Sequence, residues 1–166
     1  MMMIMKKTLF GLLLLLLIGC SKDNTVSPES QLEKDKAVID KYLADKGITA
    51  LIDPSGLRYV ITTPGQGASP VVTSVCTVKY KGTLMSNGAI FDQSTVATNF
   101  SSSSVPGGLP LSSLITGWQI GFQLLSKGSV ATLYIPSGLA YGTKGASPTI
   151  PANANLIFDV TLVSFK

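Results

Sequence analysis

The chain has 166 residues and a formal net charge of +4, from 13 basic and 9 acidic side chains, and 45% of its residues are hydrophobic. This length suits one domain with a targeting segment and a linker, and the weak, scattered charge excludes a nucleic-acid-binding surface. The sequence has no histidine, so it cannot supply a serine–histidine or cysteine–histidine nucleophile or histidine-ligated zinc. It also lacks the glycine-rich motifs that cradle phosphates. We therefore expect a function that needs no cofactor and no metal.

Residues 1–19 have the pattern of an export signal peptide. Lys6 and Lys7 provide the positive charge, and the apolar run 9–18 follows them. The run is shorter than the roughly 20 apolar residues that a permanent membrane-spanning helix requires. It ends in Leu-Ile-Gly-Cys, which resembles the lipobox of bacterial lipoproteins and implies cleavage before Cys20 and lipid attachment to its sulfur. An ordinary signal peptide followed by an incidental cysteine is the alternative.

A lipidated Cys20 would begin a polar tether over residues 20–30 and hold the chain at a membrane of the bacterial cell envelope. Ser21, directly after the cysteine, favours the outer membrane, on its periplasmic or its surface face. Acylation would leave Cys76 as the only free thiol, so no intrachain disulfide is expected. Cys76 is predicted to be a small buried residue on a strand.

Residues 31–55 are predicted to form a helix and a connector. Ser30 and Glu33 have the spacing of a capping box, and Gly47 can end the helix. Between them, apolar side chains recur at helical spacing, namely Leu32, Val38, Ile39, Tyr42 and Leu43. We expect this stripe to pack on the chain's own domain and the protein to be a monomer. Dimerisation through the helix is the alternative.

Residues 56–166 are predicted to form one domain built on an antiparallel sheet. Alternating or β-rich segments predict strands at 57–61, 75–82, 89–92, 130–135 and 155–165. Turn residues at 64–67 and 86–88 separate neighbouring strands. One short helix is predicted at 116–125. Strands joined by turns with a single helix are typical of an α+β fold.

Several short motifs follow one another through this domain. They are Val-Lys-Tyr-Lys-Gly at 78–82, Ile-Phe-Asp at 90–92, Gly-Trp at 117–118, Ala-Tyr-Gly at 140–142, Ile-Pro at 150–151 and Leu-Ile-Phe-Asp-Val at 156–160. No single motif is specific, but their order and spacing closely resemble the FKBP-type peptidyl-prolyl isomerases. The resemblance implies a curved antiparallel sheet of about five to six strands wrapped around one short helix, preceded here by the N-terminal helix.

The resemblance also implies a pocket between the helix and the sheet. Carried over by position, its catalytic residues are Tyr80, Phe91, Asp92, Trp118, Tyr141 and Phe158, and its substrate-binding residues are Phe100, Leu114, Ile115 and Ile150. Trp118 would form the floor, the Ile115 backbone N–H would bind a substrate carbonyl, and Ile150 would lie on a flexible loop over the mouth. For one wall, Phe100 is preferred and Val105 is the alternative. Without the resemblance, aromatic residues at alternate strand positions would be interpreted as core.

The function implied by the resemblance is rotation of X–Pro peptide bonds in exported, proline-containing polypeptides, which assists their folding in the cell envelope. Tacrolimus-type macrolides are the small molecules that the resemblance implies as ligands. Another hypothesis is a module that binds proline-containing segments or a partner protein with little catalysis, since residues 100–110 depart from the family pattern. A further one is a surface lipoprotein that contacts host or matrix proteins.

Overall fold

The computed structural model describes residues 27–100 and 107–166. Four features expected from the sequence lie wholly or partly outside these residues: the signal peptide, the lipid-attachment residue Cys20, the tether up to residue 26 and the Val105 alternative for the pocket wall. The described part contains a six-stranded sheet, two α-helices and three short 3₁₀ helices.

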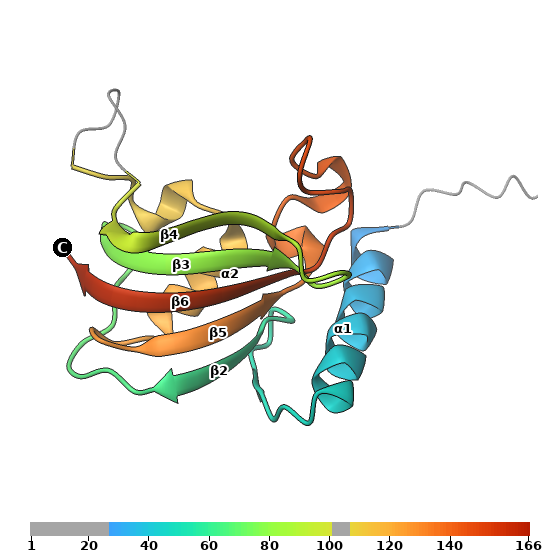
Figure 1. Cartoon of the computed structure of the whole chain (residues 1–166), viewed down its shortest axis with the longest axis horizontal. Helices are drawn as coiled ribbons and strands as arrows, with labels where there is room; N and C mark the ends of the chain where they lie inside the picture. The colour runs from blue at the N-terminus through green and yellow to red at the C-terminus, as the bar shows by residue number, and fades with distance from the viewer. Residues whose placement is uncertain (1–26, 101–106) are drawn as a thin grey trace, which may run out of the picture.

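The sheet is antiparallel throughout, with strand order β1-β2-β5-β6-β3-β4 (Figure 1). Its strands are β1 (Leu51–Ile52), β2 (Arg58–Thr63), β3 (Cys76–Leu84), β4 (Ile90–Thr98), β5 (Val130–Ile135) and β6 (Leu156–Phe165). The predicted α+β fold with its antiparallel sheet is confirmed. Strand β4 continues beyond the predicted end at Asp92. Strand β1 was not predicted, because two residues are too few to show an alternating pattern.

Helix α2 (Thr116–Gln123) lies against one face of the sheet and ends slightly before its predicted end (Figure 1). On β6, the alternate residues that face this helix are buried, namely Leu156, Phe158, Val160 and Leu162. Gly117 and Gly121 lie one helical turn apart, and a Cβ atom on either would collide with Ile135 or Leu133 of β5. Because these two positions have no side chain, the helix can approach the sheet closely.

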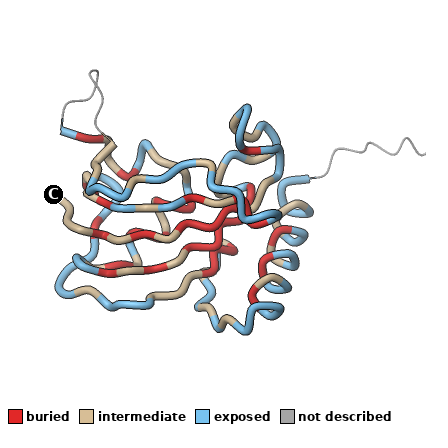
Figure 2. Tube along the Cα trace, in the orientation of Figure 1, coloured by how far each residue is buried: buried red, intermediate tan, exposed pale blue. Residues whose placement is uncertain are grey.

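Helix α1 (Pro28–Asp45) packs on the opposite face of the sheet, near one end of the strands (Figure 1). Its buried residues Ile39 and Leu43 contact Tyr134 and Ile157. In β5 and β6, these two residues alternate with those that face α2. Figure 2 shows buried positions along the side of α1 that faces the sheet and exposed positions on its outer side. The expected packing of the helix on its own domain is therefore confirmed.

The N-terminus of α1 lies before the predicted one. The Ser27 hydroxyl accepts a hydrogen bond from the Ser30 backbone N–H at 3.2 Å, so Ser27 is the capping residue and the capping box predicted at Ser30 is wrong. Pro28 occupies the first helical position, where its missing N–H costs no helical hydrogen bond. Gly47 follows the last turn with φ of 64°, as a glycine at a helix C-terminus commonly does.

The apolar stripe predicted for α1 is only partly correct. Val38 is 53% exposed, and the position that faces the domain one turn before Ile39 belongs to Asp35, which is 2% exposed. The predicted stripe followed apolar residues alone and so missed a buried carboxylate. Over 27–100 and 107–166, no helix has both the length and the apolar character that crossing a membrane would require.

Candidate active site

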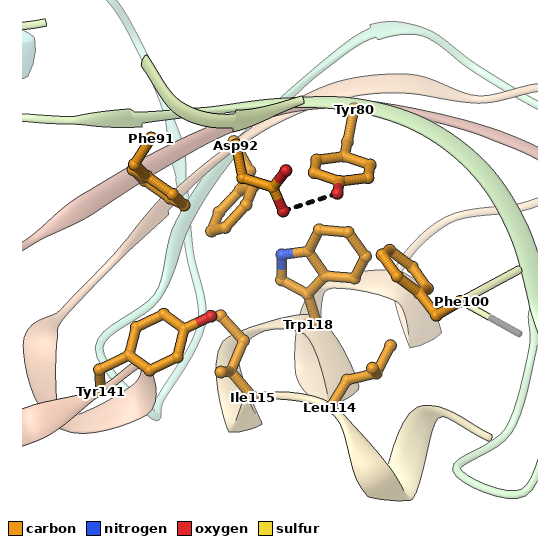
Figure 3. Close-up of a pocket in the computed structure, with 9 residues that line it drawn as sticks. Tyr80, Phe91, Asp92, Phe100, Leu114, Ile115, Trp118 and Tyr141 are labelled. Atoms are coloured by element: carbon orange, nitrogen blue, oxygen red, sulfur yellow. Dashed lines mark hydrogen bonds between the residues drawn. The ribbon is translucent and has the colours of Figure 1, made fainter. Parts of the chain in front are cut away.

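A cavity of about 200 Å³ opens between α2 and the part of the sheet formed by β3, β4 and β6 (Figure 3). Nine residues line it, and all of them belong to the set that the sequence placed in the pocket: Tyr80, Phe91, Asp92, Phe100, Leu114, Ile115, Trp118, Tyr141 and Phe158. They come from three strands, one helix and three connecting segments, so the fold as a whole brings them together.

Phe91 and Asp92 both face the cavity although they are neighbours on β4. A regular strand would send their side chains to opposite faces. Here the register with β3 slips, because Gly82 pairs with Asp92 whereas Thr83 pairs with Ile90. Phe91 is the extra residue of this β-bulge, and bulges redirect side chains in this way.

Gly82 is required at the centre of this wall. It pairs with Asp92 of β4 on one side and with Phe158 of β6 on the other. A Cβ atom at this position would lie 2.6 Å from the Phe91 ring and 2.8 Å from the Phe158 ring. The two rings meet edge to face, with centroids 5.4 Å apart, only because the glycine leaves this space open.

Trp118 forms the floor of the cavity at the start of α2. Its buried ring lies 5.1–5.3 Å, between centroids, from the rings of Tyr80, Phe100 and Phe158. The Trp118 Nε1–H is buried and has no acceptor among the described residues. Most buried N–H groups are paired. The floor therefore presents apolar ring surface and one unpaired donor.

Among the described residues, Asp92 is the only acidic one in the lining. The Tyr80 hydroxyl donates to Asp92 Oδ2 at 2.7 Å (Figure 3). Burial, followed by this hydrogen bond and the Asp92 charge, raises the pKa of Tyr80 well above its ordinary value of 10.0. Burial and then the Asp92 charge also raise the pKa of Tyr141. Both hydroxyls therefore remain protonated donors at neutral pH.

The segment between η1 (Leu111–Ser113) and α2 carries Leu114 and Ile115. The Gln119 side-chain amide donates to the Leu114 carbonyl at 2.8 Å and so holds this segment in place. The Ile115 carbonyl accepts from the backbone N–H of Trp118 at 2.9 Å. In the described part of the chain, the Ile115 N–H has no acceptor, as is usual at a helix N-terminus. It is therefore an unpaired donor on a residue that lines the cavity.

Tyr141 lies between η2 (Ser137–Leu139) and η3 (Gly142–Lys144), and its hydroxyl points toward the cavity (Figure 3). Ile150, which was expected over the mouth, is not among the residues that line the cavity. Ile150 and Ala146 exchange two backbone hydrogen bonds of 2.8 Å, and the Ile150 side chain is buried in the main core. This turn directs the side chain inward.

The residues that support the lining were not predicted. Gln119 lies on a helix whose spacing does not distinguish it from other polar residues.

Among residues 27–100 and 107–166, no three His, Cys, Asp or Glu side chains gather as a metal site would require. The arrangement suits the binding of an apolar ring flanked by carbonyl groups.

Several known proteins are similar to this chain in sequence. A family model described as FKBP-type peptidyl-prolyl cis-trans isomerase matches residues 67–163. The chain is 42% identical over 112 residues to the FKBP-type peptidyl-prolyl cis-trans isomerase FkpA of Aeromonas hydrophila, covering 68% of this chain and 39% of that protein. It is 38% identical over 138 residues to the outer membrane protein MIP of Legionella longbeachae, covering 81% and 55%.

A solved structure gives the same result for the fold. The crystal structure of a peptidyl-prolyl cis-trans isomerase from Pseudomonas syringae pv. tomato superposes with a TM-score of 0.68 at 29% identity, covering 84% of this chain and 96% of that one. The chain spans about half the length, or less, of the curated relatives it matches.

Proposed function

This chain belongs to the family of FKBP-type peptidyl-prolyl cis-trans isomerases, and we propose that it catalyses rotation about X–Pro peptide bonds in exported polypeptides. The observation that carries the proposal is the cavity itself, in which nine residues combine aromatic walls with a few polar groups. The names of the relative from Aeromonas hydrophila and of the Pseudomonas syringae structure describe the same activity.

The chemistry depends on the electronic structure of the amide bond. Rotation about an X–Pro bond is slow because amide resonance imposes a barrier of about 18–20 kcal/mol. Twisting the bond removes the resonance, and the twisted amide is less polar than the planar one. A cavity walled by aromatic rings excludes water and therefore favours the twisted amide relative to solution. This route needs no nucleophile, metal or cofactor.

Four polar groups of the cavity have a role in this proposal, namely the Ile115 N–H and the side chains of Tyr80, Asp92 and Tyr141. The proline ring rests on Trp118, and the Ile115 N–H and the Tyr141 hydroxyl bind the carbonyl groups that flank the rotating bond. Asp92 orients Tyr80 through their 2.7 Å hydrogen bond and places one negative charge beside the bound segment. Together these contacts hold the substrate in a turn while the bond rotates.

The proposal is tested by timing the cis-to-trans isomerisation of short X–Pro peptides, with and without tacrolimus. The protein should accelerate the reaction, tacrolimus should block the acceleration, and Tyr141→Phe should weaken it. Peptide binding without any acceleration, by a folded sample, would overturn the enzymatic role and favour the binding-module hypothesis. If the protein accelerates the reaction but tacrolimus does not block it, the enzymatic role stands and only the expected macrolide binding is wrong.

We further propose that the protein is lipid-anchored through Cys20 at the outer membrane, on its periplasmic or surface face. The Leu-Ile-Gly-Cys sequence at 17–20 supports the anchor, and the name of the Legionella longbeachae relative supports the location. Labelling cells with a fatty acid analogue should mark the wild type and leave a Cys20→Ser variant unlabelled. Equal labelling of both would contradict the anchor.

A further inference from the structure

Asp35 of α1 is a buried carboxylate that forms no ion pair within the described ranges. Its Oδ2 accepts from the Ser137 hydroxyl at 2.6 Å and from the Ser137 backbone N–H at 2.9 Å. Its Oδ1 accepts from the Gln31 side-chain amide at 2.8 Å. A buried carboxylate is costly unless its oxygens are hydrogen-bonded. Most of that compensation comes from Ser137, which is distant in the sequence and fully buried.

Ser137 begins the segment that leads to Tyr141. The Ser137 carbonyl accepts from the Ala140 N–H at 3.0 Å, and the Tyr141 carbonyl accepts from the Gly145 N–H at 3.1 Å. The first turn therefore joins Ser137 to Ala140, the residue before Tyr141, and the second turn begins at Tyr141 itself. No hydrogen bond holds the Tyr141 hydroxyl within 27–100 and 107–166, so the direction of this side chain depends on its backbone and its packing.

We propose that Asp35 is a positioning residue of the isomerase site, which acts through Ser137 on the turn that directs the Tyr141 hydroxyl into the cavity. The first turns of α1 lie beside the turns that follow β5 (Figure 1), and α1 contacts η2. The inference rests on the proposed isomerase function. It gives α1 a part in the site although no residue of this helix lines the cavity.

The test is a double-mutant cycle in the full chain, with kcat/KM measured on an X–Pro peptide. Asp35→Ala should lower kcat/KM about ten-fold, because small displacements of a substrate-binding group are costly. In a Tyr141→Phe background the same substitution should have little further effect, because the hydroxyl through which it acts is absent. Asp35→Asn should retain most of the activity, because its amide oxygen can still accept from Ser137.

Asp40→Ala is the matched control for the docking of the helix. Asp40 accepts from Arg58 Nε at 2.8 Å and from Arg58 Nη2 at 2.9 Å, so it attaches the same helix to β2 without contact to Ser137. This variant should lower Tm and leave kcat/KM unchanged well below the unfolding temperature. If Asp35→Ala does not fold, Ser137→Ala takes its place in the cycle, since it removes only the hydroxyl donor.

The outcomes separate the two proposals. A loss from Asp35→Ala that is equal with and without the Tyr141 hydroxyl would overturn the positioning role, as would an equal loss in Asp40→Ala. An inactive wild type would instead overturn the proposed function, whatever the variants do.

Discussion

The Tyr80 hydroxyl donates a 2.7 Å hydrogen bond to Asp92 across the β3–β4 pair, although the two residues are not direct partners in the register. Tyr80 pairs with Ser94, and Asp92 pairs with Gly82. The bond therefore runs diagonally along the wall of the cavity and fixes the orientation of the Asp92 carboxylate in the lining. The orientation of each of these two side chains depends on the other.

Removing the carboxylate should impair catalysis more than neutralising it. Asp92→Ala is expected to lower kcat/KM about ten-fold or more, because Tyr80 loses a charged acceptor, and bonds of this kind are worth about 1.5–3 kcal/mol. Asp92→Asn should retain part of the activity, because its amide oxygen can accept from Tyr80. Peptide isomerisation rates measure both variants, and Asp45→Ala on the exposed surface of α1 serves as the control. Equal activity in Asp92→Ala and the wild type would exclude Asp92 from the mechanism.

The activity should be insensitive to pH from neutrality to about pH 9. Burial and Asp92 raise the pKa of Tyr80 and Tyr141 above 10.0, so both hydroxyls keep their protons through this range. The chain also has no histidine that could titrate near neutrality. A pH profile of kcat/KM should therefore be flat. A decrease centred below pH 9 would show that one of the two tyrosines ionises more readily than its surroundings imply.

The fold and most of the cavity lining could be predicted from the sequence. The strand register that orients the lining side chains could not. The alternation in β3 and β6 marks the inward residues directly, because one face of each strand is buried. Alternation alone would place Phe91 and Asp92 on opposite faces. Their common side arises from the bulge opposite Gly82, which depends on the partner strand. Only the resemblance to a family gave this result.

The buried carboxylate of Asp35 shows a second reason why a prediction from the sequence failed. Asp35, Ile39 and Leu43 recur every fourth residue and share one face of α1. An acidic residue at such a position is usually exposed, so apolar periodicity favoured Val38 instead. What buries Asp35 is Ser137, whose proximity arises only when the domain is folded. The burial of the Ile150 side chain was missed for the same kind of reason, since its turn with Ala146 leaves no mark in the sequence.

The stability of the fold should decrease in alkaline solution, in part through Cys76. Burial raises the pKa of this thiol from 9.0 to about 11. As the pH rises, the unfolded chain therefore loses the thiol proton before the folded chain does. The contribution of the protonated thiol to stability is complete below pH 9 and disappears as the pH rises to about 11. In chemical denaturation, the free energy of unfolding should decrease with rising pH in both proteins. The decrease should be up to about 2 kcal/mol smaller in Cys76→Ala than in the wild type. Parallel pH curves for the two proteins would contradict the shifted thiol.

An added methyl group at Gly82 should damage both stability and activity. The Cβ atom of Gly82→Ala would push on the Phe91 and Phe158 rings, and overpacking of this kind costs about 1–3 kcal/mol. Because both rings line the cavity, kcat/KM should also fall. Gly138→Ala is the control for stability, since no atom lies within 4 Å of its added Cβ atom. Thermal unfolding that is the same for Gly82→Ala and the wild type would show that the Phe91 and Phe158 rings can move to accommodate the added methyl group.

Helix α1 should prove to be an integral part of the domain. Ile39 is 0% exposed and packs against Tyr134 and Ile157 on the face of the sheet opposite α2. Ile39→Ala would leave a cavity there and is expected to lower the free energy of unfolding by about 2–5 kcal/mol. The neighbouring Val38 is 53% exposed, so Val38→Ala should change it by no more than about 0.5 kcal/mol. Urea denaturation of the two variants compares a buried and an exposed position that are neighbours on one helix. A similar, small effect of both would mean that α1 separates from the sheet in solution, and the contact between Asp35 and Ser137 could then not persist.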